Sequence, residues 1–185
     1  MDDLLRYVNP TGPLPPLLGS RSGPVLIIGS AQCVWDDLER YDHLHIGDRI
    51  AVNGAIRYYR KPIQHAASLH PDLMWLWCSW RDDDGFLIHS THRAAGFPET
   101  IWPIHRDGGT SGLFAVLLAL MMGYEEIVLA GVPCDSSPHI YDNEPNRLTG
   151  EESTKQEWHR SMDAVFKGRV KSLSGRSAEW LGSPL

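Results

Sequence analysis

Apolar residues gather in short continuous runs along the chain, separated by longer stretches of mixed polarity. Short continuous apolar runs are typical of strands buried on both faces. They predict strands at 24–29, 49–53, 64–69, 86–90, 100–104, 125–132 and 169–174. The segments between them show helical spacing at 34–41, 54–60, 70–81, 111–122 and 155–168. Alternating strands and helices predict an α/β fold: a Rossmann-like, doubly wound, mainly parallel sheet with helices on both faces.

The two ends of the chain and one internal stretch lack this periodicity. Residues 1–23 are rich in proline and glycine and are interpreted as an N-terminal arm that wraps the domain or mediates self-association. Residues 24–185 are expected to form a single nucleotide-binding domain. Within it, residues 133–154 form a long polar loop, and the residues after 174 form a short tail. Loops of that length in compact domains are usually functional or disordered.

The composition of the chain excludes some classes of protein but does not identify a ligand. The chain has 185 residues and a formal net charge of -6, which argues against a nucleic-acid-binding surface. It contains no long apolar run that would span a membrane, and its acidic N-terminus does not have the pattern of a secretory signal. Three cysteines without a CxxC spacing suit reduced thiols. We therefore expect a soluble, cytoplasmic protein with a small-molecule ligand.

In open parallel sheets, ligands bind beyond the carboxyl ends of the strands, where the strand order reverses. Polar or glycine-containing stretches stand at the predicted strand ends and helix starts. They are 29–33, 53–54, 68–72, 107–112 and 131–135.

The stretch "GGTSG" leads directly into the most apolar predicted helix. Glycine lets the backbone approach an anion, and the first N–H groups of a helix are unpaired within it. We predict that Gly109, Thr110, Ser111 and Gly112 bind an anion, the phosphate of a nucleotide. In the alternative interpretation, a hydroxyl only caps the helix and Gly112 permits close packing. No lysine follows the glycines, so the stretch is not a Walker loop, nor does it match G-x-G-x-x-G.

The ends of the first two strands supply further candidates. Gly29, Ser30, Ala31 and Gln32 are predicted to line a nucleotide cleft, or alternatively to form only a tight turn into the next helix. Asn53 could bind a base or ribose through its amide, although Asn-Gly is also a common turn dipeptide.

The loop after the strand at 125–132 carries the candidate chemistry. His139 is the predicted general base, because imidazole titrates near neutral pH. Asp135 could position a sugar hydroxyl or hold a divalent metal beside phosphates. His70 is a rival base at the end of another strand.

Other histidines and tryptophans receive a structural interpretation. His89 and His92 match no zinc-binding spacing and are expected to be solvated or to support other residues. Trp77 and Trp80 are expected on one helix face, with Trp75 pointing elsewhere.

The order "VLIIGSAQCVWDDL", "RIAVNGAI" and "GGTSGLFAVLLALMMGYEEIVLAGVPCD" resembles the superfamily of bacterial sialyltransferases and pterin diphosphokinase-like proteins over residues 24–135. The resemblance implies that residues 30–32 form the first nucleotide loop and that Asn53 contacts the base or ribose. It places residues 110–112 near phosphate or sugar, and Val132, Pro133 and the residues up to Asp135 at the edge of the pocket. The first loop lacks the family's asparagine and second glycine. The C-terminal sequence also resembles small uncharacterised phage proteins, which would act in the host cytoplasm.

Three functions follow from these residues. The first is a glycosyltransferase-like enzyme with a nucleotide-sugar donor, in which His139 is the base and Arg106 helps to stabilise the leaving phosphate. The second is a Mg²⁺-dependent diphosphotransferase of the pterin kinase type, with Asp135 and Asp142 as metal ligands. The third is a non-catalytic protein that binds or sequesters a nucleotide and forms homo-oligomers through its arm and tryptophans.

Overall fold

The computed structural model describes residues 4, 17–92, 100–102, 109–142, 144 and 152–185. Its centre is a seven-stranded sheet with the strand order β5-β4-β3-β2-β1-β6-β7, in which all neighbouring strands are parallel. The strands are β1 (Pro24–Ile28), β2 (Asp48–Val52), β3 (His65–Ala67), β4 (Leu87–Ser90), β5 (Thr100–Ile101), β6 (Glu126–Ala130) and β7 (Val170–Ser172). Strands β1, β3, β6 and β7 end one or two residues earlier than predicted, where the chain turns into the loops at the carboxyl edge, whereas β2 has the predicted length but begins one residue earlier.

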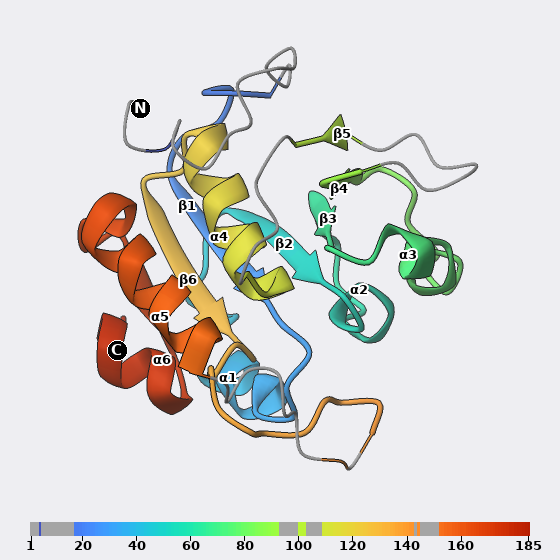
Figure 1. The fold of residues 1–185 in the computed structure, drawn as a ribbon. Coiled ribbons are helices and arrows are strands. Elements are labelled where there is room, and N and C mark those ends of the chain that lie inside the picture. The colour runs from blue at the N-terminus through green and yellow to red at the C-terminus, as the bar shows by residue number, and fades with distance from the viewer. Residues whose placement is uncertain (1–3, 5–16, 93–99, 103–108, 143, 145–151) are drawn as a thin grey trace.

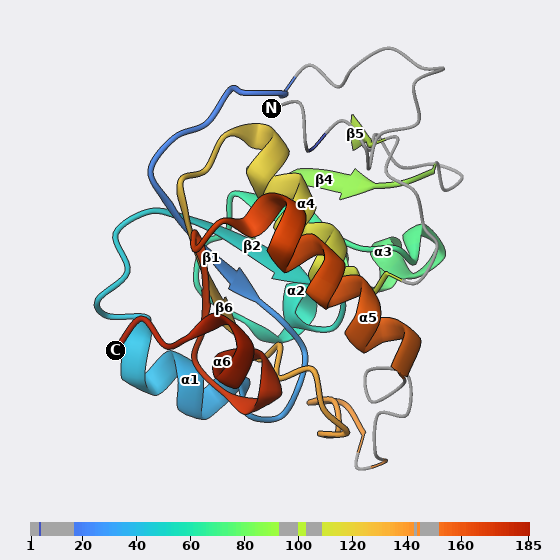
Figure 2. The same ribbon diagram turned by 60° about the vertical axis from the view of Figure 1, so that its left-hand side comes forward.

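Helices cover both faces of this sheet (Figures 1 and 2). They are α1 (Val34–Tyr41), α2 (Ala55–Tyr58), α3 (Pro71–Cys78), α4 (Ser111–Met122), α5 (Glu152–Ser161), the π-helix η2 (Met162–Phe166) and α6 (Gly175–Leu181). One apolar layer joins α4, α5 and η2 to the sheet, and the other joins α1, α2 and α3 to its opposite face. The predicted Rossmann-like, doubly wound class is confirmed. Within the described residues, no helix combines the length and apolar character needed to cross a membrane.

The central strand β1 is apolar at successive positions, with no alternation of apolar and polar residues, because both of its faces are covered. Val25 and Ile27 pack into the layer with α4, whereas Leu26 and Ile28 pack into the layer with α1. Successive side chains of a strand point to opposite faces, so a strand covered on both sides needs apolar residues at every position.

Helix α4 is buried along its whole length except at Gly112, and its observed bounds are the predicted ones. The backbone N–H groups of Gly19 and Arg21 donate to the carbonyls of Met121 and Met122, at 2.9 and 2.8 Å. The last carbonyls of a helix lack partners within it, and here the end of the predicted arm satisfies two of them. Most of the remaining arm lies outside the described residues.

A chain of buried polar groups crosses the α4 face of the sheet. The Trp102 indole N–H donates to His89 Nδ1 at 3.0 Å, and His89 Nε2 lies 2.9 Å from His65 Nδ1. His65 Nε2 lies 3.1 Å from the Tyr124 hydroxyl, which in turn donates to Asp48. Indole can only donate, so every bond in the chain has one consistent direction when both imidazoles are neutral.

Burial of this chain holds both imidazoles in their neutral form. Desolvation, reinforced by the charge of Arg21, lowers the pKa of His65 to about 4. Desolvation also lowers the pKa of His89 to about 3, with His65 and Arg21 acting in the same direction. His92 is exposed as expected. His89 is fully buried and bonds to His65 and Trp102, so of the two alternatives expected for it the supporting role holds and solvation does not.

Two other predictions need correction. The residues after 174 are not an unstructured tail, because they contain α6, whose Leu181 joins the core. Trp80 does not share a helix face with Trp77, because α3 ends at Cys78 and Trp80 follows it. Trp77 is buried, whereas Trp80 is half exposed with the Arg57 guanidinium 4.1 Å above its ring.

Candidate functional site

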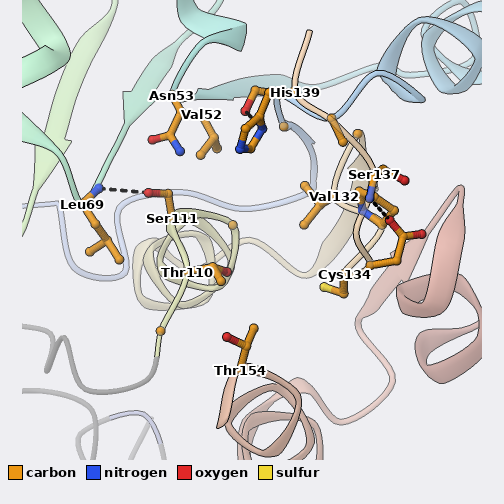
Figure 3. A pocket seen from close by; sticks show the side chains of 18 of the residues that line it. Val52, Asn53, Leu69, Thr110, Ser111, Val132, Cys134, Ser137, His139 and Thr154 are labelled. Carbon is orange, nitrogen blue, oxygen red and sulfur yellow. Dashed lines mark hydrogen bonds between the residues drawn. The ribbon is translucent and has the colours of Figure 1, made fainter. Parts of the chain in front are cut away.

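A cleft of about 340 Å³ opens at the carboxyl edge of the sheet (Figure 3). Loops after β1, β2, β3 and β6 contribute to it, together with the N-terminal ends of α4 and α5. Strand β1 pairs with β2 on one side and with β6 on the other, so the strand order reverses here. Ligands of open parallel sheets bind at such a point. The cleft is lined by Gly29, Ser30, Ala31, Val52, Asn53, Leu69, His70, Gly109, Thr110, Ser111, Gly112, Gly131, Val132, Pro133, Cys134, Asp135, Ser137, His139, Ser153 and Thr154.

The parallel sheet brings almost all predicted site residues together, because it places every strand end at one edge. Those in the cleft lining are Gly29, Ser30, Ala31, Asn53, Gly109, Thr110, Ser111, Gly112, Val132, Pro133, Asp135 and His139. Their contacts with a ligand stay predictions.

Gln32 is the predicted site residue that does not line the cleft. Its side-chain Nε2 donates to the carbonyl of Asp142 at 3.1 Å, and its backbone N–H donates to the carbonyl of Pro138 at 2.9 Å. The residue fastens the loop after β6 to the loop after β1. Its side chain therefore stabilises the two loops beside the cleft without lining the cleft itself.

His139 is held against the loop after β1 by its backbone and its ring. It forms an isolated antiparallel bridge with Ala31, and the N–H of Ile140 donates to the carbonyl of Ser30 at 2.8 Å. Its Nδ1 lies 3.2 Å from Ser30 Oγ, and its ring stacks on Tyr141 with 4.9 Å between centroids and 19° between planes. These contacts fix the orientation of the imidazole beside the cleft.

The hydroxyl groups at the start of α4 form hydrogen bonds within the protein. Thr110 Oγ1 accepts from the N–H of Leu113 at 3.2 Å, and is therefore the N-cap. Ser111 Oγ accepts from the N–H of Leu69 at 3.3 Å, which ties α4 to the end of β3 (Figure 3). The helix itself provides no acceptor for its first backbone N–H groups. These groups, with the positive end of the helix dipole, are what α4 presents to an anion.

Two cleft glycines are required by close packing between strands and helix. A Cβ on Gly29 would lie 2.3 Å from the carbonyl oxygen of Gly131. A Cβ on Gly112 would lie 2.8 Å from Cγ1 of Val132. Close packing, the alternative interpretation of Gly112 given above, thus explains why this position has no side chain.

Asn53 directly follows β2 and has a left-handed backbone conformation with φ of 53°. Its Oδ1 accepts from Ser68 Oγ at 2.7 Å, and Ser68 Oγ in turn accepts from the N–H of His70 at 2.8 Å. This relay orients the side-chain amide and leaves its NH₂ as the group that a base or ribose would meet.

The acidic and sulfur groups of the β6 loop have structural roles as well. Asp135 Oδ1 accepts from the N–H of Ser137 at 2.8 Å, which shapes the turn. The pKa of the Cys134 thiol is raised by burial and by the charge of Asp135. Asp142 is not part of the cleft lining, so the two carboxylates expected to share Mg²⁺ do not both face the cleft. No group of three or more metal-binding side chains occurs among the residues that the structure describes.

Several lining residues were not predicted from the sequence. Ser153 and Thr154 belong to the first turn of α5, which begins at Glu152 and not at the expected 155. Acidic residues are enriched in the first turn of a helix, so the glutamates at 151 and 152 are the signal that would have identified them. His70, named as the rival base, also lines the cleft.

Helix α6 supports the cleft from behind. Ser177 Oγ donates to the carbonyl of Val132 at 2.6 Å, and the Ser177 N–H donates to the carbonyl of Pro133 at 3.1 Å. A Cβ on Gly175 would lie 2.3 Å from Cβ of Pro133. The predicted tail therefore fixes the loop that follows β6.

The described residues of the cleft lining carry little charge. Its lining there contains no lysine or arginine, and Asp135 is its carboxylate. Arg106, predicted to assist the leaving phosphate, lies outside the described residues.

Comparison with known proteins identifies the fold. No protein-family model and no curated protein matches the chain. The solved structure of the sialyltransferase CstII from Campylobacter jejuni with cytidine-5'-monophosphate is 17% identical, with a TM-score of 0.55 over 88% of this chain and 85% of that chain. CstII with CMP-3FNeuAc gives a TM-score of 0.52 at 14% identity, over 89% of each chain. A mammalian sialyltransferase gives 0.50 at 13% identity, over 95% of this chain and 78% of that one. The chain therefore has a sialyltransferase-like fold, which confirms that part of the resemblance.

Proposed function

We propose that the protein transfers a sugar from a nucleoside-monophosphate-linked donor, of the CMP-sugar type, to an acceptor hydroxyl. The observation that carries the proposal is the cleft at the point of strand-order reversal, with His139 and two helix N-termini around it. The similar solved structures of CstII contain CMP and a CMP-sugar analogue, which supports the same class of ligand here.

The electrostatics of the cleft favour a donor with a single phosphate. The described lining has no lysine or arginine, so compensation for phosphate charge comes from the backbone N–H groups and dipoles at the starts of α4 and α5. Each helix N-terminus carries roughly half a positive charge. Two of them roughly balance the one negative charge of a CMP-sugar phosphodiester, whereas a nucleoside diphosphate brings more charge.

The residues of the cleft suit the separate steps of such a transfer. The Asn53 amide is assigned to the base or ribose, and Asp135 to a sugar hydroxyl. The acceptor oxygen forms a bond with the anomeric carbon while the bond from that carbon to the phosphate oxygen breaks. His139 takes the acceptor proton, and CMP leaves with the electron pair, stabilised by the first N–H groups of α4.

A thermal-shift screen followed by a turnover assay tests this function. CMP at about a hundred times its dissociation constant should add about 2.7 kcal/mol and raise the melting temperature by roughly 5–10 °C without Mg²⁺. CMP release from CMP-linked sugars is then measured with hydroxyl acceptors. The variant His139→Gln should keep the CMP shift and lose turnover by about a hundredfold or more. The exposed His43 gives the matched control, His43→Gln, which should change neither.

The alternatives give different results in the same assay. A shift produced by ATP only with Mg²⁺ would contradict the proposal in favour of the diphosphotransferase. CMP binding without turnover of any CMP-linked sugar would indicate a nucleotide-binding protein without transferase activity.

A further inference from the structure

Ser68 directly follows β3, and its side chain is fully buried. Among the described residues its Oγ has two hydrogen-bond partners, the backbone N–H of His70 at 2.8 Å and the side chain of Asn53 at 2.7 Å. A backbone N–H can only donate, so it occupies one lone pair of the hydroxyl. The single proton of Ser68 is left for Asn53, and Asn53 Oδ1 accepts it.

The opposite orientation of the Asn53 amide is unfavourable. If the amide turned over, its NH₂ would face Ser68, and the buried hydroxyl proton would lose its acceptor. The backbone of Asn53 is held on both sides, because its N–H donates to the carbonyl of Ala67 at 3.3 Å and its carbonyl accepts from the N–H of Ile56 at 3.0 Å. Ser68 therefore selects one of the two orientations of the amide.

The selected orientation presents N–H groups to the cleft. Figure 3 shows the amide nitrogen of Asn53 on the side nearer His139 and the amide oxygen on the far side. None of the described residues accepts a hydrogen bond from this NH₂, so its N–H groups are available to a ligand. An amide free to turn would offer either a donor or an acceptor at this place, whereas the fixed amide offers donors only.

We propose that Ser68 is a positioning residue that sets the hydrogen-bonding specificity of the cleft beside β2. Through Asn53 it favours a ligand that presents an acceptor atom there and disfavours one that presents a donor. The inference rests on the proposed function for the identity of the ligand, whose acceptor atom belongs to the base or the ribose of CMP. Ser68 is not among the described residues that line the cleft, so it acts on binding only through Asn53.

The test is a double-mutant cycle of Ser68→Ala and Asn53→Gly, measured as CMP affinity by calorimetry. Glycine suits the left-handed backbone at position 53. Each single change should weaken CMP binding about threefold to tenfold, the weight of one neutral hydrogen bond. When Asn53 is already replaced, Ser68→Ala should cost less than about twofold, because its route to the ligand is gone. Losses that multiply would show a general structural effect of Ser68 and overturn the inference.

Ser90→Ala is the matched control. Ser90 is also a fully buried serine, at the end of the neighbouring β4, but its Oγ has no hydrogen-bond partner within the part of the chain that the structure describes. Its replacement should leave CMP affinity unchanged. Repeating the cycle with 2′,3′-dideoxy-CMP identifies the acceptor atom, because a coupling that persists belongs to the base and one that disappears belongs to the ribose.

Asn53→Asp tests the polarity of the group that Asn53 presents. The carboxylate still accepts from Ser68, but it offers the ligand an acceptor in place of a donor. CMP binding should therefore weaken more than in Asn53→Gly. An affinity equal to that of the wild-type protein would contradict the assignment of a donor to this position.

Spectra of the protein without ligand test the orientation of the amide independently of CMP. The ¹H–¹⁵N signals of the Asn53 NH₂, identified by their absence in Asn53→Gly, should exchange rapidly with water because the group faces the cleft. A proton protected from exchange would mean that the NH₂ faces buried Ser68, and the inference would be wrong. If exchange is rapid but the wild-type protein does not bind CMP, the proposed function fails and the role of Ser68 in orienting Asn53 stands.

Discussion

Replacement of Asp37 by alanine should cause a large loss of stability, although this residue lies on the polar-looking helix α1. Its side chain is fully buried. Asp37 Oδ2 accepts from the Gly131 N–H at 2.8 Å and from Ser174 Oγ at 2.7 Å, and Oδ1 accepts from Arg40 at 2.7 Å. One carboxylate thus joins α1, the loop after β6 and the start of α6.

The size of the loss follows from what alanine leaves behind. The Gly131 N–H becomes a buried donor without its acceptor, at a cost of about 1–3 kcal/mol. Loss of the Ser174 bond adds about 1.5–3 kcal/mol, because the acceptor was charged. Arg40 is half exposed, so its ion pair adds only about 0–1 kcal/mol. We expect a total of about 2.5–7 kcal/mol, which lowers the melting temperature by roughly 5–28 °C.

Urea unfolding followed by tryptophan fluorescence measures this loss. The denaturant midpoint should fall with an unchanged m-value, since the surface exposed on unfolding stays the same. The neighbouring Asp36 is exposed, so Asp36→Ala should change the free energy of unfolding by less than about 0.5 kcal/mol. A loss below about 1 kcal/mol for Asp37→Ala, or equal losses for both variants, would refute the assigned role of the buried carboxylate.

Three further predictions test the buried histidines and the cleft. His65 and His89 have folded-state pKa values of about 4 and about 3, below the usual 6.5, so the unfolded chain binds protons first as the pH falls. Their contribution to stability is present above pH 6.5 and should be lost as the pH falls, by up to about 3 kcal/mol per pH unit near pH 5, where the unfolded chain binds two protons more than the folded one. His65→Asn should roughly halve this slope in urea titrations. Gly29→Ala should lower the melting temperature sharply because its Cβ meets a carbonyl, whereas Gly109→Ala, whose Cβ meets no described atom within 4 Å, should not; similar melting temperatures would contradict this. Thr110→Ala should cost about 1 kcal/mol as a lost N-cap, and an unchanged urea midpoint would argue against capping.

The class of fold, and the edge of the sheet at which the candidate site residues meet, could be predicted from the sequence alone. Continuous apolar runs at β1 and β6 predicted strands covered on both faces, and the bounds of α4 could be read from its glycines and apolar length. Because all strands are parallel, residues that end different strands must meet at one edge. That rule sufficed to bring Asn53, Thr110 and His139 to one cleft from separate parts of the chain.

The hydrogen-bond partners of the individual side chains, in contrast, could be learned from the tertiary structure but not from the sequence. The Ser111 hydroxyl accepts from the N–H of Leu69, because a buried backbone group requires a partner. The Gln32 side chain donates to the carbonyl of Asp142 in an exposed bond between two loops that are far apart in the sequence. The structural role of the Asp37 carboxylate likewise depends on a partner far along the chain, because it accepts from the N–H of Gly131. Periodicity records which face of an element is buried, but long-range pairing between loops leaves no local pattern in the sequence.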